Sequence, residues 1–562
     1  MDYSKLAELL FPNILRTPDD YEKMYPQRKL SDGEEVTRFA PSPTGFLHVG
    51  NVYAALIGMQ CARQSKGIFF LRIEDTDKKR EVENAAKELP ANLAAFGIEF
   101  DEGYTADGVG KGEYGPYLQS ERKDIYQAYA KWLVELGKAY PCFCSAEELE
   151  EMREHQEDNK LEIGYYGKFA KWRDASLEQI EEAIGMGLAW VLRLKSNGSV
   201  ENRMQANDLV RGQRDVPENQ NDVIILKSDG IPPYNFAHAV DDHLMRTTLV
   251  VRGDEWLPSL PEHLQIFQAL GFESPKYAHI SPLLKLDGEN KRKLSKRKDP
   301  EARADFFLDK GYPIESIHDY LMNIANSDFE GWRALNPKAS IDKFDFKLDK
   351  VNPSGSMFDV VKLDDVSKNA ISTFSATEVF KRIATWAAKY QSGFCATIGC
   401  DALGEIADKA KADYAVAVLN IDREKEKPRK DIAYWAQVRD VFSYMFSELH
   451  EYESVTFSEK FAAEDVSAVL KAYPSIYNVK DDQAQWFDRI KALAEKIGFA
   501  REVKEFKQNP GTYRGHCGDV STIIRVALTG RENTPDLYQI CKLLGVDEIK
   551  KRFELVLENL NK

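Results

Sequence analysis

The sequence predicts a multidomain protein: a Rossmann-like α/β domain with a parallel sheet, an inserted α+β domain, and mainly α-helical C-terminal domains. Three observations support this fold class. Residues 35–77 alternate between strand and helix patterns, a polar stretch of mixed character follows Tyr140, and helical periodicity dominates after about residue 300. The chain has 562 residues, which is enough for roughly three to five domains.

The segment from residue 36 to 73 has the pattern of a βαβ unit. Residues 36–39 form a short β-prone run, and the prolines and glycine of residues 41–45 end it. The next segment carries apolar residues at helical spacing, namely Val49, Val52, Leu56 and Met59. Residues 68–73 are apolar enough for a strand buried on both faces. We therefore expect the opening of a parallel nucleotide-binding sheet.

The remaining elements follow in order. Residues 126–137 are helical in pattern, and residues 223–226 and 248–251 have the pattern of buried strands of the same sheet. Gly and Pro between residues 528 and 535 separate two C-terminal helices. The predicted domains are an N-terminal extension (1–36), the two halves of the Rossmann-like domain (37–114 and 223–290), an inserted domain (115–222), a connecting region (291–372) and a helical domain (373–562).

Composition excludes several classes of protein. No apolar run approaches the roughly 20 residues of a membrane helix, and the acidic first 30 residues do not resemble a secretory or transit signal. Seven scattered cysteines indicate a reducing compartment, so a cytoplasmic location is expected. The net charge of −15 alone argues against nucleic-acid binding, but residues 291–298 and 425–430 are local basic clusters.

The first motif runs from Arg38 to Asn51, Arg-Phe-Ala-Pro-Ser-Pro-Thr-Gly-Phe-Leu-His-Val-Gly-Asn. A proline-rich loop delivers His48 and Gly50 to the start of a helix, where backbone N–H groups and the helix dipole favour phosphate. His48 can donate a hydrogen bond to a phosphate oxygen, and Gly50 allows close approach to the backbone. A surface loop before a helix explains this segment alone equally well.

The second motif, Lys293-Leu-Ser-Lys-Arg297, lies about 240 residues further along the chain. Lys293 and Lys296 could close over a triphosphate and stabilise the charge that develops at phosphorus. Considered alone, the motif is better explained as a solvated basic run.

Together, the two motifs resemble the signature sequences of class I aminoacyl-tRNA synthetases, usually spelled His-Ile-Gly-His and Lys-Met-Ser-Lys-Ser. The fuller first string is similar to that of bacterial-type glutamyl-tRNA synthetases. Further strings match this family in the same order: Arg72-Ile-Glu-Asp-Thr-Asp77, Gly115-Pro-Tyr-Leu-Gln-Ser-Glu-Arg122, Tyr234-Asn-Phe-Ala-His-Ala-Val-Asp-Asp-His-Leu-Met245, Val251-Arg-Gly-Asp-Glu-Trp256 and Ala527-Leu-Thr-Gly530. The resemblance covers nearly all of the chain beyond residue 36.

The resemblance implies a role for each matching residue. Arg38 would bind the side-chain carboxylate of glutamate, because a planar guanidinium can pair with a carboxylate twice. Arg252 would supply a second cation to the amino-acid site. The other residues implied there are Ala40, Ser42, Glu74, which would face the ammonium group, and Tyr234. The ATP site would contain Asn51, Glu255, Trp256 and Leu294, together with a catalytic phosphate-binding set of His48, Gly50, Lys293 and Lys296.

The implied reaction is activation of L-glutamate by ATP to glutamyl-adenylate, followed by transfer to the terminal ribose of tRNA(Glu). ATP would enter with Mg²⁺, and the resemblance implies that tRNA must be bound before activation. Glutamine would be rejected because two buried arginines would lack a carboxylate partner. No membrane partner is expected, and the protein is expected to be a monomer.

The sequence departs from the family pattern in the inserted domain. Some members hold a structural zinc with Cys-x-Cys and a later Tyr-x-x-x-Cys. Here Cys142-Phe-Cys144 is followed by Tyr165-Tyr-Gly-Lys-Phe169. Two thiols and a tyrosine are a poor tetrahedral zinc site, so no structural zinc or other metal is expected. His238 is interpreted as a packed histidine rather than a substrate contact.

Several alternative functions remain open from the sequence. A non-discriminating synthetase would also charge tRNA(Gln) with glutamate, and an arginine near residues 423–431 is expected to bear on that choice. A tRNA-base-modifying relative would lack the roughly 260 residues that follow Lys298. A small-molecule adenylyltransferase would lack the second arginine and the helical tail, and a non-catalytic tRNA-binding protein should have lost His48 or Lys296.

Overall fold

The computed structural model describes residues 1–77, 82, 84–451, 455–509 and 511–560. The chain divides into two compact units. The first unit contains residues 1–306 and 318–360, and the second contains residues 307–317 and 361–562. Among the described residues, no helix is long and apolar enough to cross a membrane.

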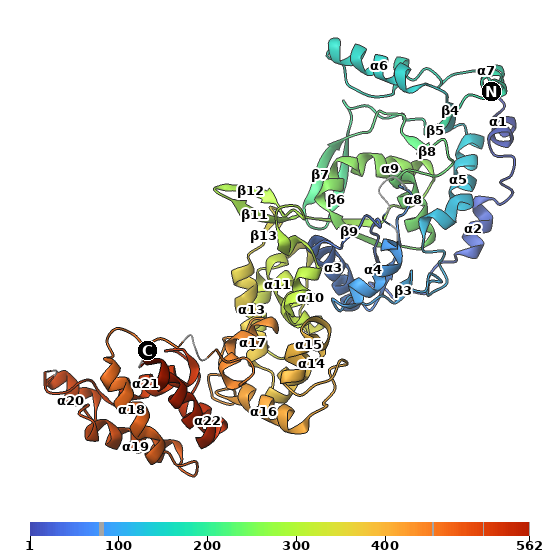
Figure 1. Ribbon diagram of the computed structural model, residues 1–562. Helices are drawn as coiled ribbons and strands as arrows, with labels where there is room; N and C mark the ends of the chain where they lie inside the picture. The colour runs from blue at the N-terminus through green and yellow to red at the C-terminus, as the bar shows by residue number, and fades with distance from the viewer. Residues whose placement is uncertain (78–81, 83, 452–454, 510, 561–562) are drawn as a thin grey trace. The chain divides into compact units, whose positions relative to one another are not determined.

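The first unit is organised around a seven-stranded sheet with the order β3-β2-β1-β9-β10-β6-β7 (Figure 1). Five strands run parallel in the order β3-β2-β1-β9-β10, and β6 pairs parallel to β10. The strands are β1 (Val36–Phe39), β2 (Ile68–Leu71), β3 (Glu102–Gly103), β6 (Arg203–Asp208), β7 (Gly212–Pro217), β9 (Leu249–Gly253) and β10 (Lys276–Ile280).

The predicted βαβ unit is confirmed. Helix α3 (Val49–Ser65) connects β1 to β2, and the two strands pair in parallel from Val36 opposite Ile68 to Phe39 opposite Leu71. All four residues of β1 are buried, as expected for a strand covered on both faces. Chain order reverses between β1 and β9, and ligands of open parallel sheets bind at such a point beyond the carboxyl ends of the strands.

Two predicted features of the sheet differ from the structure. The apolar run at residues 223–226 forms β8 (Ile224–Leu226), which pairs antiparallel with β5 (Val191–Leu194) in a small sheet completed by β4 (Ala139–Cys142). Strands β6 and β7, whose residues fall within the predicted inserted domain (115–222), pair with each other and extend the main sheet. Apolar periodicity identifies a buried strand but does not specify which sheet it joins.

The other helices of the chain up to residue 335 complete this description. The N-terminal helix α1 packs on α5, with Leu6, Leu10 and Phe11 buried. The helices are α1 (Tyr3–Leu10), α2 (Pro18–Met24), α4 (Ala85–Ala94), α5 (Lys123–Glu135), α6 (Ala146–Asp158), α7 (Leu177–Gly185), α8 (Tyr234–Leu244), α9 (Leu260–Ala269), α10 (Asp305–Lys310), α11 (Ile314–Ala325) and α12 (Asp328–Leu335).

The second motif follows an extended hairpin, visible in Figure 1. Strands β11 (Leu283–Asp287) and β12 (Asn290–Lys293) pair antiparallel, and β13 (Ser356–Met357) lies parallel to β11. Gly288 has φ of +63° in the turn, a conformation that side chains disfavour. Lys293 is the last residue of β12, and Lys296 lies in the loop that follows.

The second unit is helical, as predicted. The helices Cys517–Thr529 and Leu537–Leu560 are separated at the predicted turn, and the second of them is kinked at Gly545. The helices are α13 (Val360–Ser372), α14 (Ala376–Tyr390), α15 (Ser392–Thr397), α16 (Lys409–Asn420), α17 (Ala436–Val441), α18 (Ala463–Ile476), α19 (Gln483–Lys496), α20 (Val503–Gln508), α21 (Cys517–Thr529) and α22 (Leu537–Leu560).

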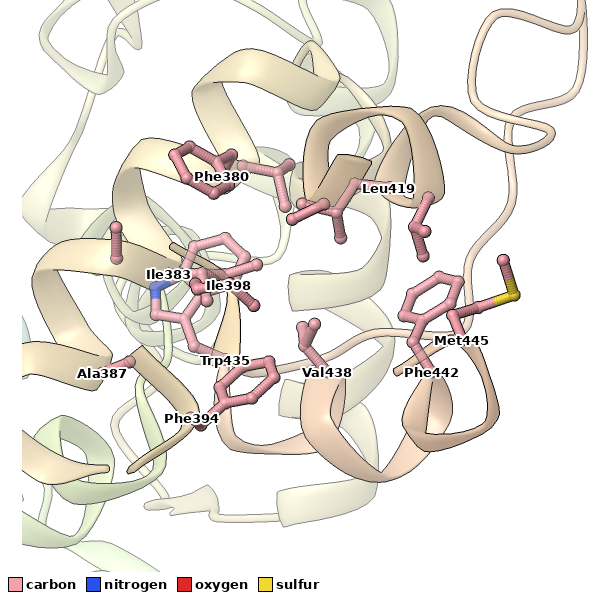
Figure 2. Packing of buried hydrophobic residues seen from close by; sticks show 14 of the residues in the cluster. Phe380, Ile383, Ala387, Phe394, Ile398, Leu419, Trp435, Val438, Phe442 and Met445 are labelled. Carbon is pink, nitrogen blue, oxygen red and sulfur yellow. The ribbon is translucent and has the colours of Figure 1, made fainter. Parts of the chain in front are cut away.

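Figure 2 shows the hydrophobic cluster that joins α14, α15, α16 and α17. Phe442 is fully buried in it, and the space between its neighbours holds only about 10 Å³. We predict that Phe442→Ala lowers the free energy of unfolding of the second unit by about 3–5 kcal/mol, because it leaves a cavity. Urea unfolding of the full chain measures this. Leu403, which is 80% exposed, is the control, and an equal effect of Leu403→Ala would contradict the prediction.

Candidate active site

Predicted amino-acid-binding residues converge at the carboxyl ends of the parallel strands. Arg38 lies in β1, Arg252 lies in β9, and Tyr234 is the first residue of α8. Glu74 follows β2, and its backbone N–H donates to the carbonyl of Pro41 at 3.0 Å. Burial raises the pKa of Tyr234, while Arg252 and Arg38 oppose that rise and Glu74 adds to it. The charges of Arg38, Arg252 and Glu74 therefore all affect the hydroxyl of Tyr234.

Arg38 is buried and anchored at one end of its guanidinium group. Its Nε lies 3.3 Å from Oδ1 and 3.4 Å from Oδ2 of Asp242. Among the described residues, its Nη1 and Nη2 atoms have no hydrogen-bond partner. Burial opposes the charge of Asp242, but Arg38 and Arg72 overcome it and hold the pKa of this carboxyl well below its usual range. The outer edge of Arg38 is thus left for a planar anion.

Glu74 is paired with Arg72, whose Nη2 donates to its Oε1 at 3.0 Å. This ion pair is compatible with a substrate role for Glu74, because its Oε2 makes no hydrogen bond within the described residues. Burial raises the pKa of Glu74 despite Arg72 and Arg38. A cationic group bound at Oε2 would favour the ionised form.

Arg252 lies against aromatic rings and neutral polar groups. Its Nη1 donates to the Tyr234 hydroxyl at 3.3 Å, and its guanidinium lies 4.8 Å from the ring centroid of Tyr277. The rings of Tyr234 and Trp256 are 4.1 Å apart. The predicted glutamate site and Trp256, which was assigned to the ATP site, are therefore adjacent.

Two sequence strings of the resemblance meet in a buried network that positions α8. Asp241 accepts hydrogen bonds from Arg122 Nε at 2.7 Å, Gln119 Nε2 at 2.8 Å and the Tyr126 hydroxyl at 2.8 Å. The adjacent Asp242 binds Arg38 and Arg72. Asp241 and Asp242 were not among the predicted site residues. Besides the family string that contains them, the signal in the sequence was two adjacent acids within a helical pattern.

The predicted phosphate-binding residues form a second group around His48. His48 is the N-cap of α3, and its Nδ1 accepts a hydrogen bond from Gly50 N at 2.8 Å. Its Nε2 therefore carries the proton and faces the carbonyl of Leu294 at 3.3 Å. Burial, together with Lys296 and Lys293, lowers the pKa of His48 despite that contact. The neutral ring can exchange the Leu294 carbonyl for a phosphate oxygen.

Gly50 lies close to the ring of His48. A Cβ atom at this position would lie 3.0 Å from Nδ1 of His48. Gly50 is the second residue of α3, and its N–H already donates to the ring of His48. The Nε2–H group of His48 is the available donor.

Of the two lysines of the second motif, Lys296 contacts the first motif and Lys293 lies near Glu255. Lys296 Nζ donates to the carbonyl of Phe46, and Lys293 Nζ lies 3.8 Å from Oε2 of Glu255. Burial and the neighbouring Arg303 lower the pKa of Lys296. Asp299 holds the loop closed by accepting from Arg292 at 2.6 and 2.8 Å and from the N–H of Ser295 at 2.9 Å. Asp299 was not identified from the sequence.

Ala40, Ser42 and Asn51, three predicted site residues, take little part in these contacts. Ala40 is partly exposed, while Ser42 and Asn51 are exposed, at the loop after β1 and the first turn of α3.

His238 is fully buried, with Nε2 3.1 Å from the Tyr277 hydroxyl and Nδ1 2.6 Å from Asp242. His238 is therefore a packed histidine, as interpreted from sequence.

The inserted domain brings the two cysteines and the tyrosine together. The thiols of Cys142 and Cys144 lie 3.3 and 3.5 Å from the hydroxyl of Tyr165. Phe169 instead packs edge-on against the ring of Tyr166 at 5.6 Å. Within the described part of the chain, no group of three His, Cys, Asp or Glu residues is arranged to hold a metal ion.

The role of His48 leads to a testable pair of variants. We predict that His48→Ala slows amino-acid activation by about 10- to 100-fold, because the phosphate loses a hydrogen-bond donor. His48→Asn should keep the helix cap, which is worth about 1 kcal/mol, but its shorter side chain places no donor at the position of His48 Nε2. Pyrophosphate exchange and thermal unfolding separate the two effects. A wild-type rate in both variants would assign His48 a structural role only.

A parallel sheet with a histidine-capped helix at β1 and a lysine loop facing it defines a class I tRNA synthetase catalytic domain. The family model for class I tRNA synthetases (E and Q), catalytic domain, matches residues 35–365, and an anticodon binding domain model matches residues 512–557. The chain belongs to this synthetase family, in its glutamate–tRNA ligase branch.

Relatives along the full chain support that assignment. The chain is 47% identical over 559 residues to the glutamate–tRNA ligase of Clostridium perfringens (strain SM101 / Type A), covering 99% of both chains. It is 41% identical to the glutamate–tRNA ligase of Sorangium cellulosum (strain So ce56), covering 96% of this chain and 97% of the relative. The crystal structure of a glutamate tRNA ligase from Elizabethkingia meningosepticum CCUG26117 in complex with its amino acid superposes with a TM-score of 0.73 at 25% identity, covering 94% of this chain and 100% of that one.

Proposed function

We propose that this protein attaches L-glutamate to tRNA(Glu) in two steps, using ATP. The α-carboxylate of glutamate attacks the α-phosphorus of ATP, which forms glutamyl-adenylate and releases pyrophosphate. A hydroxyl of the terminal ribose of tRNA then attacks the acyl carbon, and AMP leaves. Neither step needs a protein nucleophile, so the side chains act by positioning and by charge.

One observation carries the amino-acid assignment. Two buried arginines, Arg38 and Arg252, both lie near enough to Tyr234 to oppose the rise of its pKa, and each has donor groups not used by carboxylates of the described residues. Glu74 supplies an anion beside them. Two cations and one anion match two carboxylates and one ammonium, which is the charge pattern of glutamate at neutral pH. Glutamine lacks one of these charges and would leave a buried guanidinium unpaired.

The second group of residues suits a triphosphate. His48, Lys293 and Lys296 present donors and positive charge, which match phosphate oxygens and do not match a metal ion. Mg²⁺ would arrive on the oxygens of ATP, as is usual for this ion, and supply further charge there. We assign no step of the reaction to it.

The remaining proposals concern partners and location. We propose tRNA(Glu) as the RNA substrate, since the comparisons give tRNA(Gln) no support. Arg423, in the segment considered for tRNA discrimination, is buried and donates to the carbonyls of Leu419, Ile371 and Phe374. Burial lowers its pKa to about 10. Arg423 therefore directs its hydrogen-bond donors at backbone carbonyls. We also propose a cytoplasmic monomer.

Charging of purified tRNA(Glu) and tRNA(Gln) with labelled glutamate tests the function, with labelled glutamine as the control. Glutamate on tRNA(Glu) alone is the expected result. Glutamate on both tRNAs would make the enzyme non-discriminating. No charging of either tRNA would overturn the proposal and return attention to an adenylyltransferase.

A further inference from the structure

Arg252 differs in what holds it from three other buried arginines of the first unit, Arg38, Arg72 and Arg122. Arg38, Arg72 and Arg122 each lie within ion-pair distance of an aspartate. Arg252 is only 6% exposed, yet among the described residues no carboxylate lies within 4.0 Å of its guanidinium. Burying an unneutralised cation is unfavourable unless something else in the site requires it.

The acceptors that hold Arg252 are two histidines and a tyrosine. Its Nε donates to His279 Nε2 at 2.9 Å, and its Nη2 lies 2.9 Å from Nδ1 of His263. Both histidines are fully buried. A guanidinium group has donors only, so each of these ring nitrogens must be the unprotonated one.

The second ring nitrogen of each histidine has a partner that keeps the nitrogen facing Arg252 unprotonated. His279 Nδ1 lies 2.6 Å from Asp208 Oδ2, and His263 Nε2 lies 2.8 Å from Asn235 Oδ1. Each histidine therefore donates on its far side and accepts on the side facing Arg252. Burial lowers the pKa of both imidazoles, and Arg252 lowers them further, which favours the neutral rings.

We propose that His263 and His279 are positioning residues that hold Arg252 with neutral acceptors and so reserve its charge for a carboxylate of the substrate. The inference rests on the proposed function and names residues that determine its specificity. An aspartate in place of His263 could also accept from Arg252, but it would neutralise the guanidinium before glutamate arrives. A neutral acceptor fixes the side chain and leaves its positive charge without a partner.

His263 is the better position for a test, because His279 faces Asp208 and a new carboxylate there would meet a like charge. Titratable and charged groups around His263 come from α8 (Tyr234, His238 and Asp242), β9 (Arg252), β10 (His279) and its own neighbour Glu262. Asn235 and Trp256 also pack against it.

The experiment compares His263→Asn with His263→Asp, which differ by one amide group. The asparagine oxygen can accept from Arg252, so we expect the KM for glutamate to rise by about threefold or less. The aspartate should raise that KM by more than about 30-fold, because its charge competes with the substrate carboxylate. The KM for ATP should change by less than about twofold in both variants, since the phosphate contacts are untouched.

The controls separate the possible outcomes. Thermal unfolding checks that each variant is folded, and His263→Leu, which removes the acceptor without adding charge, replaces the aspartate variant if that one does not fold. The leucine variant should raise the KM for glutamate more than the asparagine variant does. The inference would be overturned if His263→Asn and the variant compared with it, His263→Asp or its replacement His263→Leu, had equal KM values for glutamate, whether high or low. If the wild-type enzyme fails to charge tRNA with glutamate, the proposed function fails instead.

Discussion

Replacement of Arg38 by alanine is expected to raise the KM for glutamate by about 100- to 1,000-fold, which corresponds to losing a charge-assisted pair of hydrogen bonds in a buried site. The KM for ATP should change by less than about threefold. Arg38 is buried, it is held at Nε by Asp242, and its Nη1 and Nη2 atoms are not bonded within the described residues. The variant removes the planar end that a substrate carboxylate would meet.

Pyrophosphate exchange at varied glutamate and ATP, in the presence of tRNA, measures both constants. Arg38→Lys is the matched control, because it retains a cation but loses the planar pair of donors. We expect its KM for glutamate to lie between those of wild type and the alanine variant. Asp242 keeps Arg72 as a partner at 2.7 Å, so the variants should fold. Equal increases in both KM values would show that Arg38 serves the fold rather than the substrate.

Replacement of Lys296 by alanine is expected to slow adenylate formation by about 100- to 1,000-fold, the magnitude typical for removing a preorganised charge from a developing anion. Lys296 reaches across to the carbonyl of Phe46 in the first motif, and burial with Arg303 lowers its pKa. Its ammonium group already lies at the loop that precedes His48. Positive charge held there needs little rearrangement when phosphate arrives.

Lys298 is the matched control, since it has the same charge, lies in the same loop and pairs with Asp287 at 3.9 Å on the surface. Lys298→Ala should change the activation rate by less than about twofold, as expected for an exposed pair. The affinity for tRNA, measured by filter binding, should fall similarly in both variants. An unchanged pyrophosphate-exchange rate in Lys296→Ala would remove this lysine from the catalytic set.

Much of the first unit could be predicted because local patterns determine local structure. The proline-rich break after residue 39, the helical spacing from Val49 and the apolar run from Ile68 each specify one element, and together they form the observed βαβ unit. The strand at residues 224–226 shows the limit of this reasoning. Its apolar character is the same in either sheet, so pairing with β5 is decided by contacts distant in sequence.

The sequence alone determined which residue types are available for chemistry. Two motifs, about 240 residues apart, contain a histidine, two lysines and a glycine suited to phosphate, and separate strings contain the arginines suited to carboxylate. It also determined that the C-terminal half is helical and that Phe169 stands where a fourth zinc ligand would be.

Only the tertiary structure decided which charges are already used and which remain for a ligand. Arg72 forms an ion pair with Asp242, and Arg122 forms one with Asp241. Arg252 is instead held by His263 and His279, whose protons lie on the ring nitrogens that face away from it. Ion pairing depends on distances of a few ångströms between residues that lie up to hundreds of positions apart. Sequence spacing does not encode such distances, and the packing of α8 and α9 against the sheet sets them.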